Sequence, residues 1–266
     1  MLRRIVRGVG RAVLSSYVRR DAVVLGREGL VTFTFDDFPR SAYRVGGQIL
    51  AEADARGTFY AVPGLMDTTP EWFQREDVTN LLRDGHELGS HTFNHVSCRR
   101  ISRAAYRTDA EAGKAAIGTL NNNGNCDHFA YPFGHVGLRS KQDMGKLFRT
   151  CRGIWSGING PRLDLSLLRA NSLCSASVPL ERVSNLIDET RRSGGWLIFC
   201  THDIGEHPTK FGCTPQYFER AVCTAVRSGV RIVTVSKAVS GWVCAEQPSE
   251  ELRSARQRLE SSKSSR

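Results

Sequence analysis

Residues 30–37 read LVTFTFDD, an apolar run that ends in two adjacent carboxylates. The β-branched and aromatic residues of Leu30–Phe35 predict a buried strand. Two neighbouring carboxylates at the end of such a strand lose hydration and repel each other, which a bound cation or a shared proton would offset. A turn or a helix cap is the alternative interpretation, because aspartate suits both and Pro39 follows.

Strand-like and helix-like stretches alternate along the rest of the chain. The other predicted strands are Thr58–Val62, Glu87–Ser90, Phe129–Tyr131, Arg169–Ser172, Trp196–Thr201 and Arg231–Val235. The predicted helices are Ala42–Ala55, Val78–Arg83, Arg103–Leu120, Leu180–Arg192 and Pro215–Ser228. This alternation predicts an α/β protein of about six to eight βα units, closed or nearly closed into a barrel. In such barrels the chemistry lies at the carboxyl ends of the strands.

Size, charge and cysteine usage limit the class of protein. The 266 residues suit one barrel domain, and no apolar run is long enough for a transmembrane helix. A net charge of +10 favours acidic partners, but no zinc-finger or RNA-recognition pattern occurs, so we expect no specific nucleic-acid binding. The eight cysteines are dispersed without a CxxC pair or an export signal, which favours free thiols in a reducing compartment over disulfides.

Residues 91–95 read HTFNH and supply two histidines. The i,i+4 spacing predicts that His91 and His95 share one face of a helical turn, which suits a borderline cation such as Zn²⁺. Glu87 and Ser90 just upstream are candidates to orient the two rings. A pair of surface or loop histidines is the alternative interpretation.

Two further polar positions follow predicted strands. Residues 129–134 read FAYPFG, where Pro132 and Gly134 end a strand; locally, an edge strand with a turn explains this segment. His202 follows the buried run WLIFCT. A histidine at the mouth of a barrel is placed to titrate near neutral pH, although a lone histidine there is more often structural.

The clusters carry more information together than separately. One carboxylate and two histidines form a three-ligand set with open coordination positions, which is typical of a catalytic metal. The second carboxylate is then available as a general base and His202 as a general acid. These groups together are the components of metal-assisted hydrolysis.

The order of these motifs resembles that of the polysaccharide deacetylase family, also called NodB-like or carbohydrate esterase family four. The matching segments are TFDD at 34–37, HTFNH at 91–95, AYPF at 130–133 and His202. The resemblance spans most of the chain and implies an irregular (β/α)₇ barrel of the NodB-homology type. It also implies a metal-dependent hydrolase that acts on linear amide C–N bonds.

The resemblance assigns roles to individual residues. It implies a metal triad of Asp37, His91 and His95, with Zn²⁺ as the expected metal and Co²⁺, Ni²⁺ or Mn²⁺ as alternatives. It implies that Asp36 is the catalytic base and His202 the general acid.

The third-motif segment would contribute to oxyanion and substrate contacts through Tyr131 and the backbone N–H of Phe133.

Two departures from the family pattern stand out. The third motif carries an arginine at the position of Ala130, so the usual partner that orients Asp36 is missing. The fourth motif has no clean match, which leaves the partner of His202 unknown; RGIW at 152–155 lies nearby without the motif's aspartates. Arg152 is a candidate contact for a substrate anion.

The implied function is removal of the acetyl group from an N-acetylated amino sugar in a glycan or glycan precursor, such as an exopolysaccharide. A deformylase or another amide hydrolase that acts on a lipid-linked amino sugar is one alternative. A catalytically silent glycan-binding module is another, although the intact acid, base and ligand set argues against it.

The chain divides into three expected parts. Residues 1–20 interleave arginine with apolar residues and predict a basic amphipathic helix, which either packs on the enzyme or lies on an anionic membrane surface. Residues 21–246 would form the catalytic domain, and 247–266 a polar, mobile tail. Without an export signal we expect a cytoplasmic location, with peripheral contact at the inner membrane face as the alternative. No pattern specifies the oligomeric state.

Overall fold

The computed structural model describes residues 14, 16, 18–25, 28–122 and 124–245. Within them, parallel strands form a curled sheet in the order β6-β5-β4-β3-β2-β9-β8, and β10 pairs with β2. The strands are β2 (Leu30–Asp37), β3 (Thr58–Ala61), β4 (Glu87–Ser90), β5 (His128–Ala130), β6 (Thr150–Arg152), β8 (Asn171–Ser172), β9 (Trp196–Thr201) and β10 (Arg231–Ile232). The predicted irregular βα barrel is thereby confirmed.

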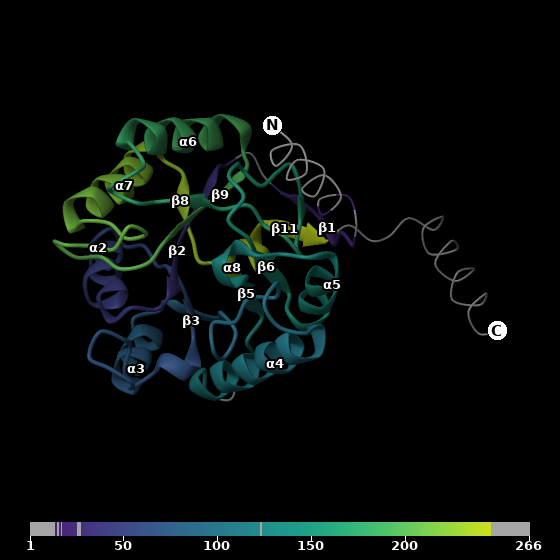
Figure 1. The fold of residues 1–266 in the computed structure, drawn as a ribbon. Helices are drawn as coiled ribbons and strands as arrows, with labels where there is room; N and C mark the ends of the chain where they lie inside the picture. The colour runs from purple at the N-terminus through teal and green to yellow at the C-terminus, as the bar shows by residue number, and fades with distance from the viewer. Residues whose placement is uncertain (1–13, 15, 17, 26–27, 123, 246–266) are drawn as a thin grey trace, which may run out of the picture.

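Helices surround the outside of this sheet (Figure 1). They are the π-helix η1 (Ala42–Gly47), α2 (Gln48–Glu52), α3 (Arg75–Arg83), α4 (Arg103–Leu120), α5 (Leu138–Leu147), α6 (Leu180–Ser193), α7 (Pro215–Ser228) and α8 (Val235–Gly241), with short 3₁₀ turns η2 (Pro63–Leu65) and η3 (Pro132–Gly134). A small antiparallel sheet lies at one side, in the order β11-β1-β7. Its strands are β1 (Asp21–Val24), β7 (Arg162–Asp164) and β11 (Val243–Ala245).

Strand β2 separates two layers of the core because side chains alternate across a strand. Phe33 and Phe35 pack toward the helices, where each ring lies 5.5 Å from the ring of Phe218 on α7. Thr34 and Asp36 are buried on the opposite, inner face of the sheet. The carboxylate of Asp36 therefore belongs to the barrel interior.

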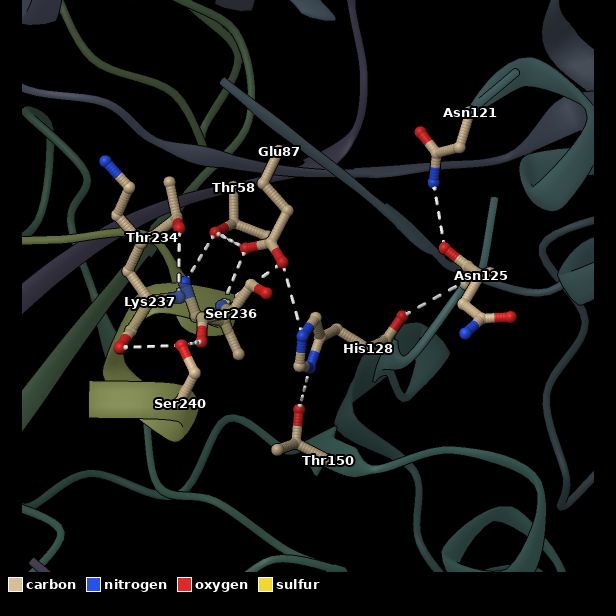
Figure 2. A network of polar contacts seen from close by, with 12 residues as sticks. Thr58, Glu87, Asn121, Asn125, His128, Thr150, Thr234, Ser236, Lys237 and Ser240 are labelled. Carbon is tan, nitrogen blue, oxygen red and sulfur yellow. Dashed lines mark hydrogen bonds and ion pairs between the residues drawn. The ribbon is translucent and has the colours of Figure 1, made fainter. Parts of the chain in front are cut away.

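A polar network closes the barrel at the amino ends of its strands (Figure 2). Glu87 accepts hydrogen bonds from Thr58 Oγ1 (2.6 Å) and from the backbone N–H of Ser236 at the start of α8 (3.1 Å). Its Oε1 also lies 3.3 Å from Nε2 of His128, whose Nδ1 contacts Thr150 Oγ1 (2.8 Å). The network joins the starts of β3, β4, β5 and β6 to α8.

Most predicted elements are present, with shifted ends. Helices α4 and α7 have the predicted bounds. The predicted helix Ala42–Ala55 begins as the π-helix η1. The predicted strand Arg231–Val235 stops at Ile232, because Thr234 caps α8 by accepting a hydrogen bond from the backbone N–H of Lys237 (3.3 Å).

The predictions for the two chain ends concern residues that mostly lie outside the described part of the structure, namely most of 1–20 and all of 247–266. No helix in the described part is long and apolar enough to cross a membrane. No disulfide joins cysteines among these residues.

Candidate metal and catalytic site

The carboxyl ends of β2 and β4 bring one carboxylate and two imidazoles together. Asp37, the last residue of β2, has a left-handed backbone conformation (φ 65°). Its Oδ1 lies 3.4 Å from Nε2 of His91 and 3.2 Å from Nε2 of His95. One ligand atom from each residue lies within 4.8 Å of the others, so the three side chains can share one metal ion.

The protonation of His91 shows why this group fits a cation. Its Nδ1 lies 2.8 Å from the carbonyl oxygen of Ala130, which can only accept, so Nδ1 carries the proton and Nε2 presents a lone pair. Burial lowers the pKa of His91 to about 4, which keeps the ring neutral at pH 7. Asp37 Oδ1 is buried and has no hydrogen-bond partner among the described residues. The acceptor oxygen of Asp37 thus faces the lone pair on Nε2 of His91, and a divalent cation between the two atoms would stabilise this arrangement.

Residues 91–95 form an irregular loop, so the prediction of a helical turn there is wrong. Thr92 and His95 have positive φ angles (65° and 54°), which a helix does not contain. Asp109 of α4 accepts hydrogen bonds from the backbone N–H of Phe93 (2.8 Å) and of the next residue (3.0 Å). These bonds satisfy the loop backbone without a helix.

The residues expected to orient the imidazoles do not do so. Glu87 lies at the start of β4, in the network at the other end of the barrel (Figure 2). Ser90 Oγ is buried and has no hydrogen-bond partner in the described residues. The carbonyl of Ala130 orients His91 instead.

His202 follows β9 and joins the same cluster from another strand. Its Nε2 lies 3.8 Å from Asp37 Oδ2, and its ring lies 5.2 Å from the ring of Phe211. Its Nδ1 is buried and has no hydrogen-bond partner among the described residues. No described side chain therefore orients this histidine in the way expected of a fourth-motif aspartate.

Asp36 has a partner that the sequence did not reveal. Arg152, at the end of β6, is fully buried, and its Nη2 forms an ion pair with Asp36 Oδ1. The opposite nitrogen, Nη1, donates to the carbonyl oxygen of Gly153 (2.9 Å). Burial raises the pKa of Asp36, but the Arg152 charge outweighs it and holds the pKa below its usual range. Asp36 therefore has an arginine partner although position 130 is alanine, and the prediction that Arg152 contacts a substrate anion is wrong because Arg152 is fully buried.

Tyr131 and Phe133 lie in different surroundings. The Tyr131 ring is buried in the core, and its hydroxyl donates to the carbonyl oxygen of Ser166 (3.1 Å), so its side chain does not reach the cluster. Phe133 is half-exposed with a left-handed backbone (φ 58°), and its ring lies 4.3 Å from that of His95. Of the two, only Phe133 lies beside a residue of the Asp37, His91 and His95 cluster.

A cavity of about 860 Å³ adjoins the cluster, and Asp37 and His202 line it. Loops after β2 and β9 and a segment around Trp72 form its other walls. Trp72 and the half-exposed Phe211 contribute aromatic surface. This volume is in the range of pockets that hold whole ligands, and it far exceeds the size of an acetyl group.

Comparisons with known proteins agree with this geometry. Residues 26–148 match the family model "Polysaccharide deacetylase". The fold is similar to that of the chitin deacetylase from Colletotrichum lindemuthianum, at 19% identity over 86% of this chain and 96% of the other, with a TM-score of 0.57. It is also similar to a family 4 acetyl xylan esterase from Clostridium thermocellum in complex with a cobalt ion, at 20% identity over 79% of this chain and 90% of the other, with a TM-score of 0.58. No curated protein matches the sequence.

Residues 26–148 are thus similar to polysaccharide deacetylases, and this match indicates a hydrolase that acts on acetamide bonds. The matched segment contains Asp36, Asp37, His91 and His95. Both His202 and Arg152 lie beyond it, so the structure rather than the family match connects them to the site.

Proposed function

We propose that the protein is a metal-dependent N-deacetylase that hydrolyses the acetamide of an amino sugar in a glycan. The observation that carries this proposal is Asp37 Oδ1, which faces the lone pair of His91 beside an arginine-bound Asp36. The family match supports an amide bond as the target. The similar fold of a chitin deacetylase supports an N-acetylated sugar as the substrate class.

The donor set supports the choice of metal. Asp37, His91 and His95 would hold a divalent cation, whose charge polarises the acyl carbonyl and makes a water molecule more acidic. Two imidazoles and one carboxylate suit Zn²⁺, and Co²⁺, Ni²⁺ or Mn²⁺ suits the same ligands. The cobalt ion in the Clostridium thermocellum esterase supports this range.

The remaining residues move protons. Asp36, kept ionised by Arg152, accepts a proton from the water that attacks the acyl carbon. The backbone N–H of Phe133 donates to the carbonyl oxygen as negative charge develops there. His202 donates a proton to the amine nitrogen as the C–N bond breaks. The products are acetate and a free amino sugar.

The adjoining cavity supports a substrate larger than one N-acetyl group. Trp72 and Phe211 present aromatic faces, which pack favourably against the apolar faces of sugar rings. We therefore assign the cavity to the sugar residues that neighbour the acetylated one.

The experiment is incubation of metal-loaded protein with N-acetylated oligosaccharides and lipid-linked amino sugars, followed by mass spectrometry and assay of the released acid. Loss of one acetyl group with release of acetate is the expected result. Asp36→Asn is the control, because it keeps the ligand set and removes the base. Release of formate would identify a deformylase, and binding of glycans without turnover would identify a glycan-binding module; either result overturns the proposed activity.

A further inference from the structure

Ala130 and Arg152 are cross-strand neighbours in the sheet. Strands β5 and β6 run parallel, and Ala130 on β5 pairs in register with Arg152 on β6. Side chains at paired positions of adjacent parallel strands point to the same face, and the strands lie about 4.8 Å apart. The family's third motif has its arginine at the position of Ala130. A guanidinium can therefore reach the same volume from either strand.

We propose that Arg152 is the positioning residue for the base Asp36, and that this role has moved from β5 to β6 in this chain. The inference rests on the proposed function, because Asp36 needs an orienting partner only if it acts as the base. The small side chain of Ala130 leaves room for the incoming arginine, and both residues are fully buried.

The surroundings of Arg152 fix the position of its guanidinium. The group lies 5.0 Å from the ring centre of Tyr60, and its Nη1 donates to the carbonyl oxygen of Gly153. The Tyr60 ring can occupy this place because the next strand has Gly89, where a Cβ atom would lie 2.7 Å from the ring. Arginine stays charged and its guanidinium is planar and rigid, so with Nη1 bound to Gly153 the Nη2 atom holds Oδ1 of Asp36 at a fixed place.

The same contacts would also exist if the pair served stability alone. A buried ion pair is weak evidence for stabilisation, whereas removal of one partner leaves an uncompensated charge. A positioning role and a purely stabilising role predict different effects of an arginine placed at position 130 in a protein that lacks Arg152. A positioning role is restored by a guanidinium delivered from position 130, at unchanged affinity for substrate and metal.

The test compares four variants by kcat, KM and calorimetric binding of Zn²⁺. Arg152→Ala should lower kcat on the order of 100-fold while KM and the Zn²⁺ affinity stay the same. Adding Ala130→Arg to Arg152→Ala should recover at least about tenfold in kcat. The matched control adds Ala130→Met instead, which fills the volume without a guanidinium and should recover nothing. Arg152→Lys keeps the charge without the fork and should lose about tenfold.

Each outcome bears on the proposal. Full kcat in a folded Arg152→Ala protein would overturn it, as would equal recovery by Ala130→Met and Ala130→Arg. If Arg152→Ala does not fold, Arg152→Lys decides, and an unchanged kcat in that variant is the contradicting result. A wild-type protein that binds Zn²⁺ but hydrolyses no N-acyl sugar would show instead that the proposed function itself is wrong.

Discussion

The side chain of Asp37 lies opposite two imidazole nitrogens, so we expect the site to depend on a cation. His91→Ala removes the ligand whose lone pair is oriented by Ala130, so we expect Zn²⁺ affinity to fall by more than about 100-fold and hydrolysis to disappear. Isothermal titration calorimetry measures the affinity. His207→Ala, at an exposed histidine, is the matched control and should change neither quantity. Wild-type affinity in the His91→Ala protein would contradict the ligand assignment.

Trp72 lines the cavity and is not one of the residues that we propose as metal ligand, base or acid. Trp72→Ala should raise KM for an N-acetylated tetrasaccharide by about fivefold, because one sugar–aromatic contact contributes roughly 1 kcal/mol. The same change should leave KM for a monosaccharide substrate unaltered. Val226→Ala, at an exposed apolar residue of α7, provides the comparison. Equal effects on both substrates would place the extra sugars elsewhere.

The residues of the site differ in how far the sequence predicts them. The ligand and base positions follow from short segments at strand ends, because each motif is contiguous in the chain and ends at the same edge of the sheet. Arg152 belongs to no such motif. Its role depends on the register between β5 and β6, and sequence spacing does not encode register between separate strands.

At the scale of elements, periodicity predicts long helices well and short or polar ones poorly. Helix α4 has the predicted bounds because its apolar positions repeat at helical spacing over 18 residues. Helix α5 reads LRSKQDMGKL, whose polar composition hides the helix, and strand β6 has only three residues. The two histidines at 91 and 95 have helical spacing, but the segment forms a loop because its backbone N–H groups donate to Asp109 of α4. Contacts with other parts of the fold determine the secondary structure of these segments.

The network around Glu87 joins four strand starts to α8, so we expect it to stabilise the barrel without affecting catalysis. Glu87→Gln loses the charge on these bonds and should lower the free energy of unfolding by about 1–3 kcal/mol. Urea denaturation measures this change, and kcat should stay the same because the network lies at the other end of the strands. Glu111→Gln breaks an exposed pair with Arg107 and should leave the free energy of unfolding nearly unchanged. A fall in kcat without a fall in stability would contradict the separation of the two ends.

At the scale of the whole molecule, one buried histidine makes stability depend on pH. His86 Nδ1 accepts a hydrogen bond from the backbone N–H of Gly57 (3.0 Å), and burial lowers the pKa of His86 from 6.5 to about 4. Between these two values the unfolded chain binds a proton that the folded protein does not. The contribution of His86 is therefore complete above about pH 6.5 and is lost as the pH falls toward 4.

A variant isolates this contribution. His86→Asn keeps an acceptor near the Nδ1 position without titrating, so its urea midpoint should fall less between about pH 7 and about pH 5 than that of the wild type. His207→Asn, at an exposed position, should follow the wild type. Parallel declines in all three proteins would mean that other groups control acid stability.

The pairing of Ala130 with Arg152 also bears on how such enzymes change over evolutionary time. Because both positions reach one buried volume, an arginine on β6 requires a small residue on β5, so the two positions are expected to change together. Searches that require every motif letter in linear order would place descendants of that exchange among inactive homologues. A comparison of where the side chains lie in space, rather than of their order in the sequence, would identify such proteins as candidates for active enzymes.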